Sequence, residues 1–96
     1  MLSTRGCPGA CVFCNSAFTT LRTRDPIKVA EQIRHLREKY GIRQVQFYDD
    51  TFTLDRERTM VFSQGIIDRK MEFKWIVRTR MDCVDDEMLA LMKKAG

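Results

Sequence analysis

Three cysteines lie within eight residues of the sequence, at Cys7, Cys11 and Cys14, separated by three and then two residues. The fourth cysteine, Cys83, stands alone far along the chain. Evenly spread cysteines are typical of disulfide scaffolds, whereas closely spaced cysteines in a cytosolic chain are more often metal ligands or redox groups. The spacing therefore predicts a metal centre held by thiolates.

Two kinds of centre fit a loop with three thiolates. In the first, each thiolate holds one iron of a cubane iron-sulfur cluster, and the fourth iron is left to bind the amine and carboxylate of a small molecule. In the second, the cysteines hold zinc structurally in a non-catalytic metal-binding or interaction module. Zinc needs a fourth ligand, so the Cys83 sulfur or a His35 nitrogen would have to lie within about 4 Å of the three sulfurs.

Short strand-like runs alternate three times with longer helical runs, which predicts parallel strands joined by helices. Asp25 and Pro26 provide a helix start and Gly41 a helix stop. We expect one partial domain over residues 1–96, with a strand and cysteine loop at 1–24, a helix at 25–40, a strand at 44–49, a helix at 55–70, a strand at 73–80 and a helix at 85–95.

The predicted fold class is therefore α/β, with three right-handed β/α units and a parallel sheet, as in half of a TIM-like barrel. Parallel sheets are usually covered on both faces or closed into a barrel. We expect the chain to be a fragment of a larger barrel, or a unit that pairs with a second copy to build a six-stranded sheet. The cysteine loop follows the first strand, at the end where β/α barrels carry their chemistry.

Phe13 immediately precedes the last cysteine of the loop, and with it residues 7–14 resemble the signature of the radical S-adenosylmethionine (SAM) superfamily. The resemblance implies a 4Fe-4S cluster on Cys7, Cys11 and Cys14, with SAM bound to the unique iron through its methionyl amine and carboxylate. It also implies that an external electron donor drives reductive cleavage of SAM to a 5′-deoxyadenosyl radical, which abstracts hydrogen from a small-molecule substrate.

Residues 47–53 and 91–96 look like the branch of this superfamily with cobalamin-binding relatives, which includes methylthiotransferases, methyltransferases and tetrapyrrole cyclases. The resemblance thus extends to cobalamin as a cofactor of the full-length protein. The later strands, which complete the adenosine and substrate contacts in the superfamily, are expected outside these residues. We therefore expect an oxidoreductase-type enzyme in full-length form and an inactive isolated fragment.

Four further residues are candidates for cofactor binding. Asp49 and Asp50 end the second predicted strand, where the superfamily commonly places groups that bind the methionyl amine, although a solvated turn explains them equally well. Arg78 and Arg80 share one face of the third predicted strand and could hold a carboxylate of SAM or substrate. Their alternative role is structural pairing near Asp82.

Composition narrows the remaining function classes. The chain has 44% hydrophobic and 31% charged residues, which indicates a globular fold rather than disorder. Its net charge of +4 comes without a basic block, so nucleic-acid binding is not expected. The longest apolar run, residues 88–92, is far shorter than the roughly 20 residues of a membrane span, and no apolar signal segment follows Met1. We expect a cytoplasmic protein.

Overall fold

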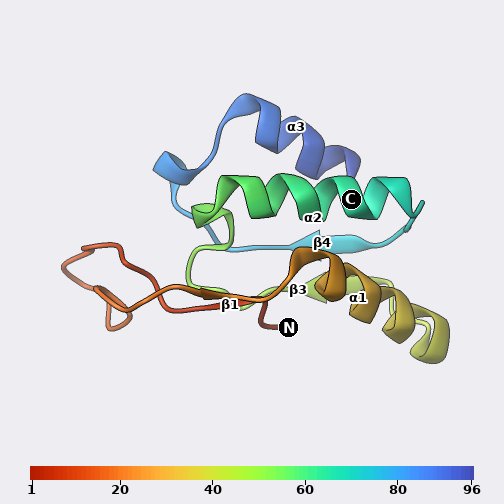
Figure 1. Cartoon of the computed structure of the whole chain (residues 1–96), viewed down its shortest axis with the longest axis horizontal. Coiled ribbons are helices and arrows are strands. Elements are labelled where there is room, and N and C mark those ends of the chain that lie inside the picture. The colour runs from red at the N-terminus through yellow and green to blue at the C-terminus, as the bar shows by residue number, and fades with distance from the viewer.

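The computed structural model describes all residues 1–96 and shows an α/β arrangement of three helices with short strands (Figure 1). The elements in chain order are β1 (Thr4–Arg5), β2 (Arg22–Thr23), α1 (Pro26–Tyr40), β3 (Gln44–Gln46), the 3-10 turn η1 (Phe52–Leu54), α2 (Arg56–Asp68), β4 (Lys74–Ile76), the 3-10 turn η2 (Met81–Cys83) and α3 (Asp86–Lys94). No helix is both long and apolar enough to span a bilayer.

Each helix begins at an aspartate whose carboxylate accepts hydrogen bonds from the first-turn amides. Asp25, Asp55 and Asp85 take this position in α1, α2 and α3, respectively. Helix α1 ends at Gly41, which adopts the left-handed conformation (φ 67°) and donates its amide to the Arg37 carbonyl. The sequence prediction of α1 is therefore confirmed at both ends, and α2 and α3 lie within the predicted helical ranges.

The parallel sheet is built from β3 and β4, with Val45 aligned with Trp75. Met1 lies along the other side of β3, because its ammonium group donates to the Gln46 carbonyl at 2.7 Å and its own carbonyl accepts from Tyr48 N at 2.9 Å. The N-terminal residue thus extends the sheet beyond the regular β3–β4 pairing.

The beginning of the chain departs from the predicted order of elements. β1 pairs with β2 in antiparallel register rather than joining β3 and β4, so the structure contains two separate two-stranded sheets. Residues 15–24 show no strand-like pattern, so β2 was not predicted from the sequence. What the structure supports is an α/β fold with a small parallel sheet, compatible with part of a barrel.

The core lies between the helices and one face of the β3–β4 sheet. Four aromatic rings pack edge-on or tilted against one another there, with centroids 4.9 to 6.2 Å apart: Phe47, Phe52, Phe62 and Trp75. Helix α2 is buried against both neighbours, and a Cβ on Gly65 would lie 3.1 Å from the Ile27 side chain. The apolar residues of α2 therefore surround its axis instead of forming one stripe.

Candidate iron-sulfur site

The cysteine loop projects from the end of the sheet at which β4 finishes (Figure 1). Gly6 opens the loop with a positive φ of 84°, and a Cβ there would lie 2.3 Å from the Thr20 carbonyl oxygen. At the loop base, Cys7 N donates to Thr19 Oγ1 at 2.9 Å and Thr19 N donates to the Cys7 carbonyl at 3.1 Å. Because these bonds fasten both ends of the loop together, it is held as a closed unit.

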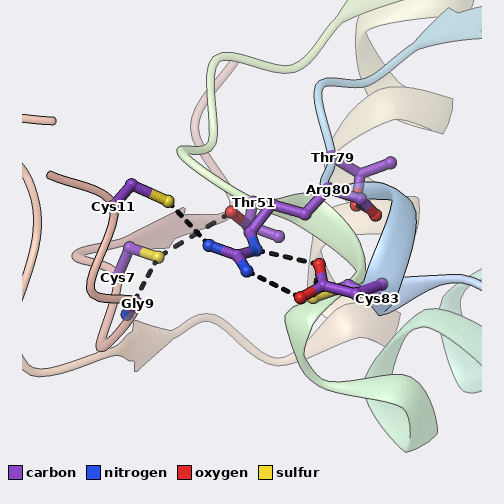
Figure 2. A network of polar contacts seen from close by, with 8 residues as sticks. Cys7, Gly9, Cys11, Thr51, Thr79, Arg80 and Cys83 are labelled. Carbon is purple, nitrogen blue, oxygen red and sulfur yellow. Dashed lines mark hydrogen bonds and ion pairs between the residues drawn. The ribbon is translucent and has the colours of Figure 1, made fainter. Parts of the chain in front are cut away.

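Cys7 is the anchored cysteine of the three. It is buried, with 7% of its surface exposed. Its Sγ accepts a hydrogen bond from Gly9 N at 3.4 Å and lies 3.8 Å from Thr51 Oγ1, which comes from the segment after β3 (Figure 2). The first sulfur of the motif is therefore in contact with the carboxyl end of the sheet.

Cys11 meets an arginine from the segment that follows β4, directly before η2. Arg80 Nη1 lies 2.7 Å from Cys11 Sγ, and the same guanidinium binds the Asp82 carboxylate through Nε at 2.9 Å and Nη2 at 2.6 Å (Figure 2). Cys14 is exposed, and its amide donates to the Cys11 carbonyl at 3.0 Å in the turn that joins them. Two of the three sulfurs thus contact groups from the sheet end, and the third faces outward.

The ion pair between Arg80 and Asp82 shifts the pKa values of both groups. The guanidinium holds the pKa of Asp82 at about 2 through their hydrogen bonds, and Asp82 in turn raises the pKa of Arg80. Burial raises the pKa of the neighbouring Cys83 thiol, and the Asp82 carboxylate adds to that effect. At neutral pH the pair is fully ionised while Cys83 is the uncharged thiol, so Arg80 is a cation in contact with the Cys11 sulfur.

The two candidate aspartates have different environments. Asp49 is only 1% exposed, and its two carboxylate oxygens accept bonds from Ser3 N at 2.7 Å and from Ser3 Oγ. Asp50 is exposed and lines an open cavity of about 520 Å³ with Gly6 and Arg22. One carboxylate is therefore used to join the N-terminus to the end of β3, and the other is free to meet a ligand.

The remaining candidates lie on the surface. Arg78 has its guanidinium carbon 5.5 Å from the centre of the Tyr48 ring and takes part in none of the ion pairs. Phe13 is 88% exposed on the cysteine loop. Trp75 and Val77 pack against the core, whereas the alternate residues Lys74, Ile76 and Arg78 are exposed.

A single-ion zinc site is not assembled. No three histidine, cysteine or acidic side chains converge on a point that could hold one metal ion. His35 is exposed on α1, and the Cys83 sulfur contacts the Asp82 carboxylate at 3.7 Å. Neither residue is therefore positioned as the fourth ligand that the zinc interpretation requires.

The donor set does fit an iron-sulfur cubane. Its three thiolates bind three different irons, so the sulfurs need not converge on one point. The loop also packs tightly at Gly9, where a Cβ would lie 3.2 Å from Cys7 Sγ and 3.4 Å from Arg80 Nη1. An amide and a guanidinium thus already aim N–H groups at two of the sulfurs, which is the kind of hydrogen bonding that cluster sulfurs receive in proteins.

Comparison with known proteins decides the family. The model of the radical SAM superfamily matches residues 1–96, the entire chain. The chain belongs to the radical SAM superfamily. The resemblance to this superfamily that was inferred from the sequence is therefore confirmed.

Characterised and uncharacterised relatives of this radical SAM chain include methyltransferases and cyclases. An uncharacterized methyltransferase of Pyrococcus horikoshii is 31% identical over 99 residues, covering 100% of this chain and 22% of the relative. The anaerobic magnesium-protoporphyrin IX monomethyl ester cyclase of Cereibacter sphaeroides is 34% identical over 98 residues, covering 96% of this chain and 16% of the relative. The cytidylyl-2-hydroxyethylphosphonate methyltransferase of Streptomyces wedmorensis is 26% identical, and the match covers 18% of that relative. The chain thus spans about a fifth of the length of these relatives.

Sequence reasoning missed three residues that shape the radical SAM loop. Thr51, Gly9 and Thr19 contact the cysteine backbone or sulfur, but none belongs to the cysteine pattern. Thr51 directly follows the aspartate pair at the end of β3, so its position beside the cysteine loop could have been anticipated from the barrel rule.

Proposed function

We propose that this chain forms the first three β/α units of a radical SAM barrel and binds a 4Fe-4S cluster through Cys7, Cys11 and Cys14. The observation that carries the proposal is the meeting of the cysteine loop with the carboxyl end of the sheet, through Thr51 and Arg80. When bound, the cluster supplies the electron that cleaves SAM to a 5′-deoxyadenosyl radical.

Asp50 is our candidate for binding the methionyl amine of SAM. Its exposed carboxylate lies one residue from Thr51, which contacts the Cys7 sulfur. An ammonium group meeting this carboxylate would form a charge-assisted hydrogen bond. Asp49 supports the site indirectly, because its bonds to Ser3 fix the position of the strand end.

Arg78 and Phe13 are the other groups that we assign to ligand binding. Arg78 has no carboxylate partner and stacks on Tyr48, so its guanidinium is available to a carboxylate of SAM or of the substrate. Phe13 is exposed beside the last cysteine and would lose that exposure to a bound cofactor. Arg80 binds Asp82 through Nε and Nη2, and its third nitrogen, Nη1, contacts Cys11 of the loop.

The complete enzyme needs more than these residues. We propose that the rest of the barrel supplies the remaining adenosine and substrate contacts, that an external donor reduces the cluster, and that cobalamin serves as a second cofactor in the full-length protein. The substrate class is a small molecule. On this account the isolated chain binds the cluster but turns over no substrate.

The proposal is tested by anaerobic reconstitution of the chain with iron and sulfide. We expect a brown protein with a sulfur-to-iron charge-transfer band, and loss of that band when Cys7, Cys11 or Cys14 is replaced by alanine. Cys83→Ala is the matched control, because it removes a thiol outside the loop, and it should leave the band unchanged. A colourless product with stoichiometric zinc would contradict the proposal.

A further inference from the structure

Arg80 is held by Asp82 in one orientation. The two residues are only two positions apart, and η2 brings the carboxylate back against the guanidinium, with Cys83 N donating to the Arg80 carbonyl at 3.1 Å. Asp82 occupies the edge formed by Nε and Nη2 in a two-bond fork. Nη1 is the one guanidinium nitrogen that makes no bond to Asp82, and it is the atom that lies 2.7 Å from Cys11 Sγ.

On the loop side, Gly9 packs closely against the contact between Arg80 and Cys11. Gly9 packs between Cys7 Sγ and Arg80 Nη1, since a Cβ there would lie 3.2 Å from the sulfur and 3.4 Å from the nitrogen. The guanidinium therefore contacts the loop on one side and Asp82 on the other, and 38% of the Arg80 side chain is exposed. Cys11 and Arg80 are 69 residues apart in sequence, so the contact joins the loop to the segment that follows β4.

We propose that Arg80, oriented by Asp82, is a positioning residue for the cluster: it hydrogen-bonds the Cys11 thiolate, holds the loop in a form ready for iron, and makes the bound cluster easier to reduce. The inference rests on the proposed function. Reduction adds one negative charge to the cluster, and a fixed cation donating to a ligand sulfur stabilises that added charge. Hydrogen bonds to the sulfurs are among the factors that set cluster potentials.

The experiment compares reconstituted wild-type chain with R80Q, R80K and R34Q. Arg34 is the charge-matched control, because it is an exposed arginine paired with Glu38 on α1 and has no contact with the loop. The readouts are the midpoint potential, from a redox titration followed by EPR, and the rate of iron loss to a chelator.

R80Q is expected to lower the equilibrium constant for cluster reduction about tenfold, which for one electron is a shift of about 59 mV to more negative potential. Loss of a group bonded to a metal ligand typically weakens metal affinity about 10- to 100-fold, so iron loss from R80Q should accelerate by a similar factor. R80K keeps the positive charge but lacks the planar guanidinium that makes two bonds to Asp82. Its midpoint potential should therefore lie between those of R80Q and wild type. R34Q should match wild type.

Two results overturn the inference in distinguishable ways. If wild type holds a cluster but R80Q and R34Q have equal potentials and equal rates of iron loss, Arg80 has no action on the cluster and the proposed function still stands. If wild type itself binds no cluster, the proposed function fails and this inference fails with it. R80K behaving like R80Q in both readouts would also contradict the role of the charge.

Discussion

Asp49 and Asp50 are adjacent carboxylates with opposite roles in our account, and replacing each by alanine separates those roles. Asp49 is buried with both oxygens bonded to Ser3, whereas Asp50 is exposed. Both substitutions remove one negative charge from neighbouring positions. Any difference in stability between the variants therefore comes from the hydrogen bonds and burial rather than from net charge.

The expected magnitude follows from the bonds that are lost. Hydrogen bonds to a charged group contribute about 1.5 to 3 kcal/mol each, so D49A should lower the free energy of unfolding by about 3 to 6 kcal/mol. A domain of this size is stable by roughly 5 to 14 kcal/mol, so the loss is a large fraction of the total. D50A should change stability by less than about 0.5 kcal/mol.

Urea unfolding followed by fluorescence of Trp75, the single tryptophan, measures both variants. Ser3→Ala removes one of the two bonds and should cost about 1.5 to 3 kcal/mol, which gives a milder variant if D49A does not fold. Equal unfolding midpoints for D49A and D50A, or an S3A variant as stable as wild type, would refute the assignment of Asp49 to the fold.

Other variants test the loop and the helix starts. D25A removes the carboxylate that caps α1 and should lower the free energy of unfolding by about 1 kcal/mol in the same urea assay. G6A places a Cβ against the Thr20 carbonyl at a positive φ, and should cost at least about 2 kcal/mol and reduce iron uptake. The Arg56 guanidinium lowers the pKa of Asp85, so this contribution to stability is present above the unfolded pKa of about 3.9 and is lost as the pH falls through the folded pKa. Wild type should therefore lose more stability than D85N as the pH falls below about 4.

Each of these variants has a contradicting result. An unchanged urea midpoint for D25A would show that the cap contributes nothing, and an unchanged midpoint for G6A would show that the loop base relaxes without cost. For D85N the control is R56Q, which removes the partner cation and should reduce the acid dependence, although the bond from Met88 N to the Asp85 carboxylate remains. Parallel acid curves for wild type and D85N would contradict the effect of the ion pair.

The helices were predictable because their signals are local. Asp25, Pro26 and Gly41 mark the ends of α1 within a few residues of the backbone groups that they cap. β1 and β2 were not predictable, because they pair residues 17 and 19 positions apart in segments that show no alternating pattern of apolar and polar residues. The two-sided burial of α2 also depends on its neighbours in space, with Gly65 against Ile27.

In the candidate site, too, local sequence signals predicted some residues, and only the fold identified the others. The cysteine spacing and Phe13 indicated the family because cluster chemistry requires three thiolates close together in sequence. The choice between Asp49 and Asp50 needed the fold, since Ser3 is 46 residues from its partner. The sequence likewise placed Arg80 on the same strand face as Arg78, but only the geometry directs it to Cys11.

The most direct test of the central claim is the EPR spectrum of the anaerobically reconstituted and reduced chain, recorded with and without SAM. On our account an iron left free by the three cysteines would bind the methionyl amine and carboxylate, so we expect the signal of a reduced 4Fe-4S cluster to change when SAM is added. The change should persist in Cys83→Ala and disappear with the cluster in Cys11→Ala. A reduced cluster whose spectrum SAM leaves unaltered, or one that is lost in Cys83→Ala, would contradict the account.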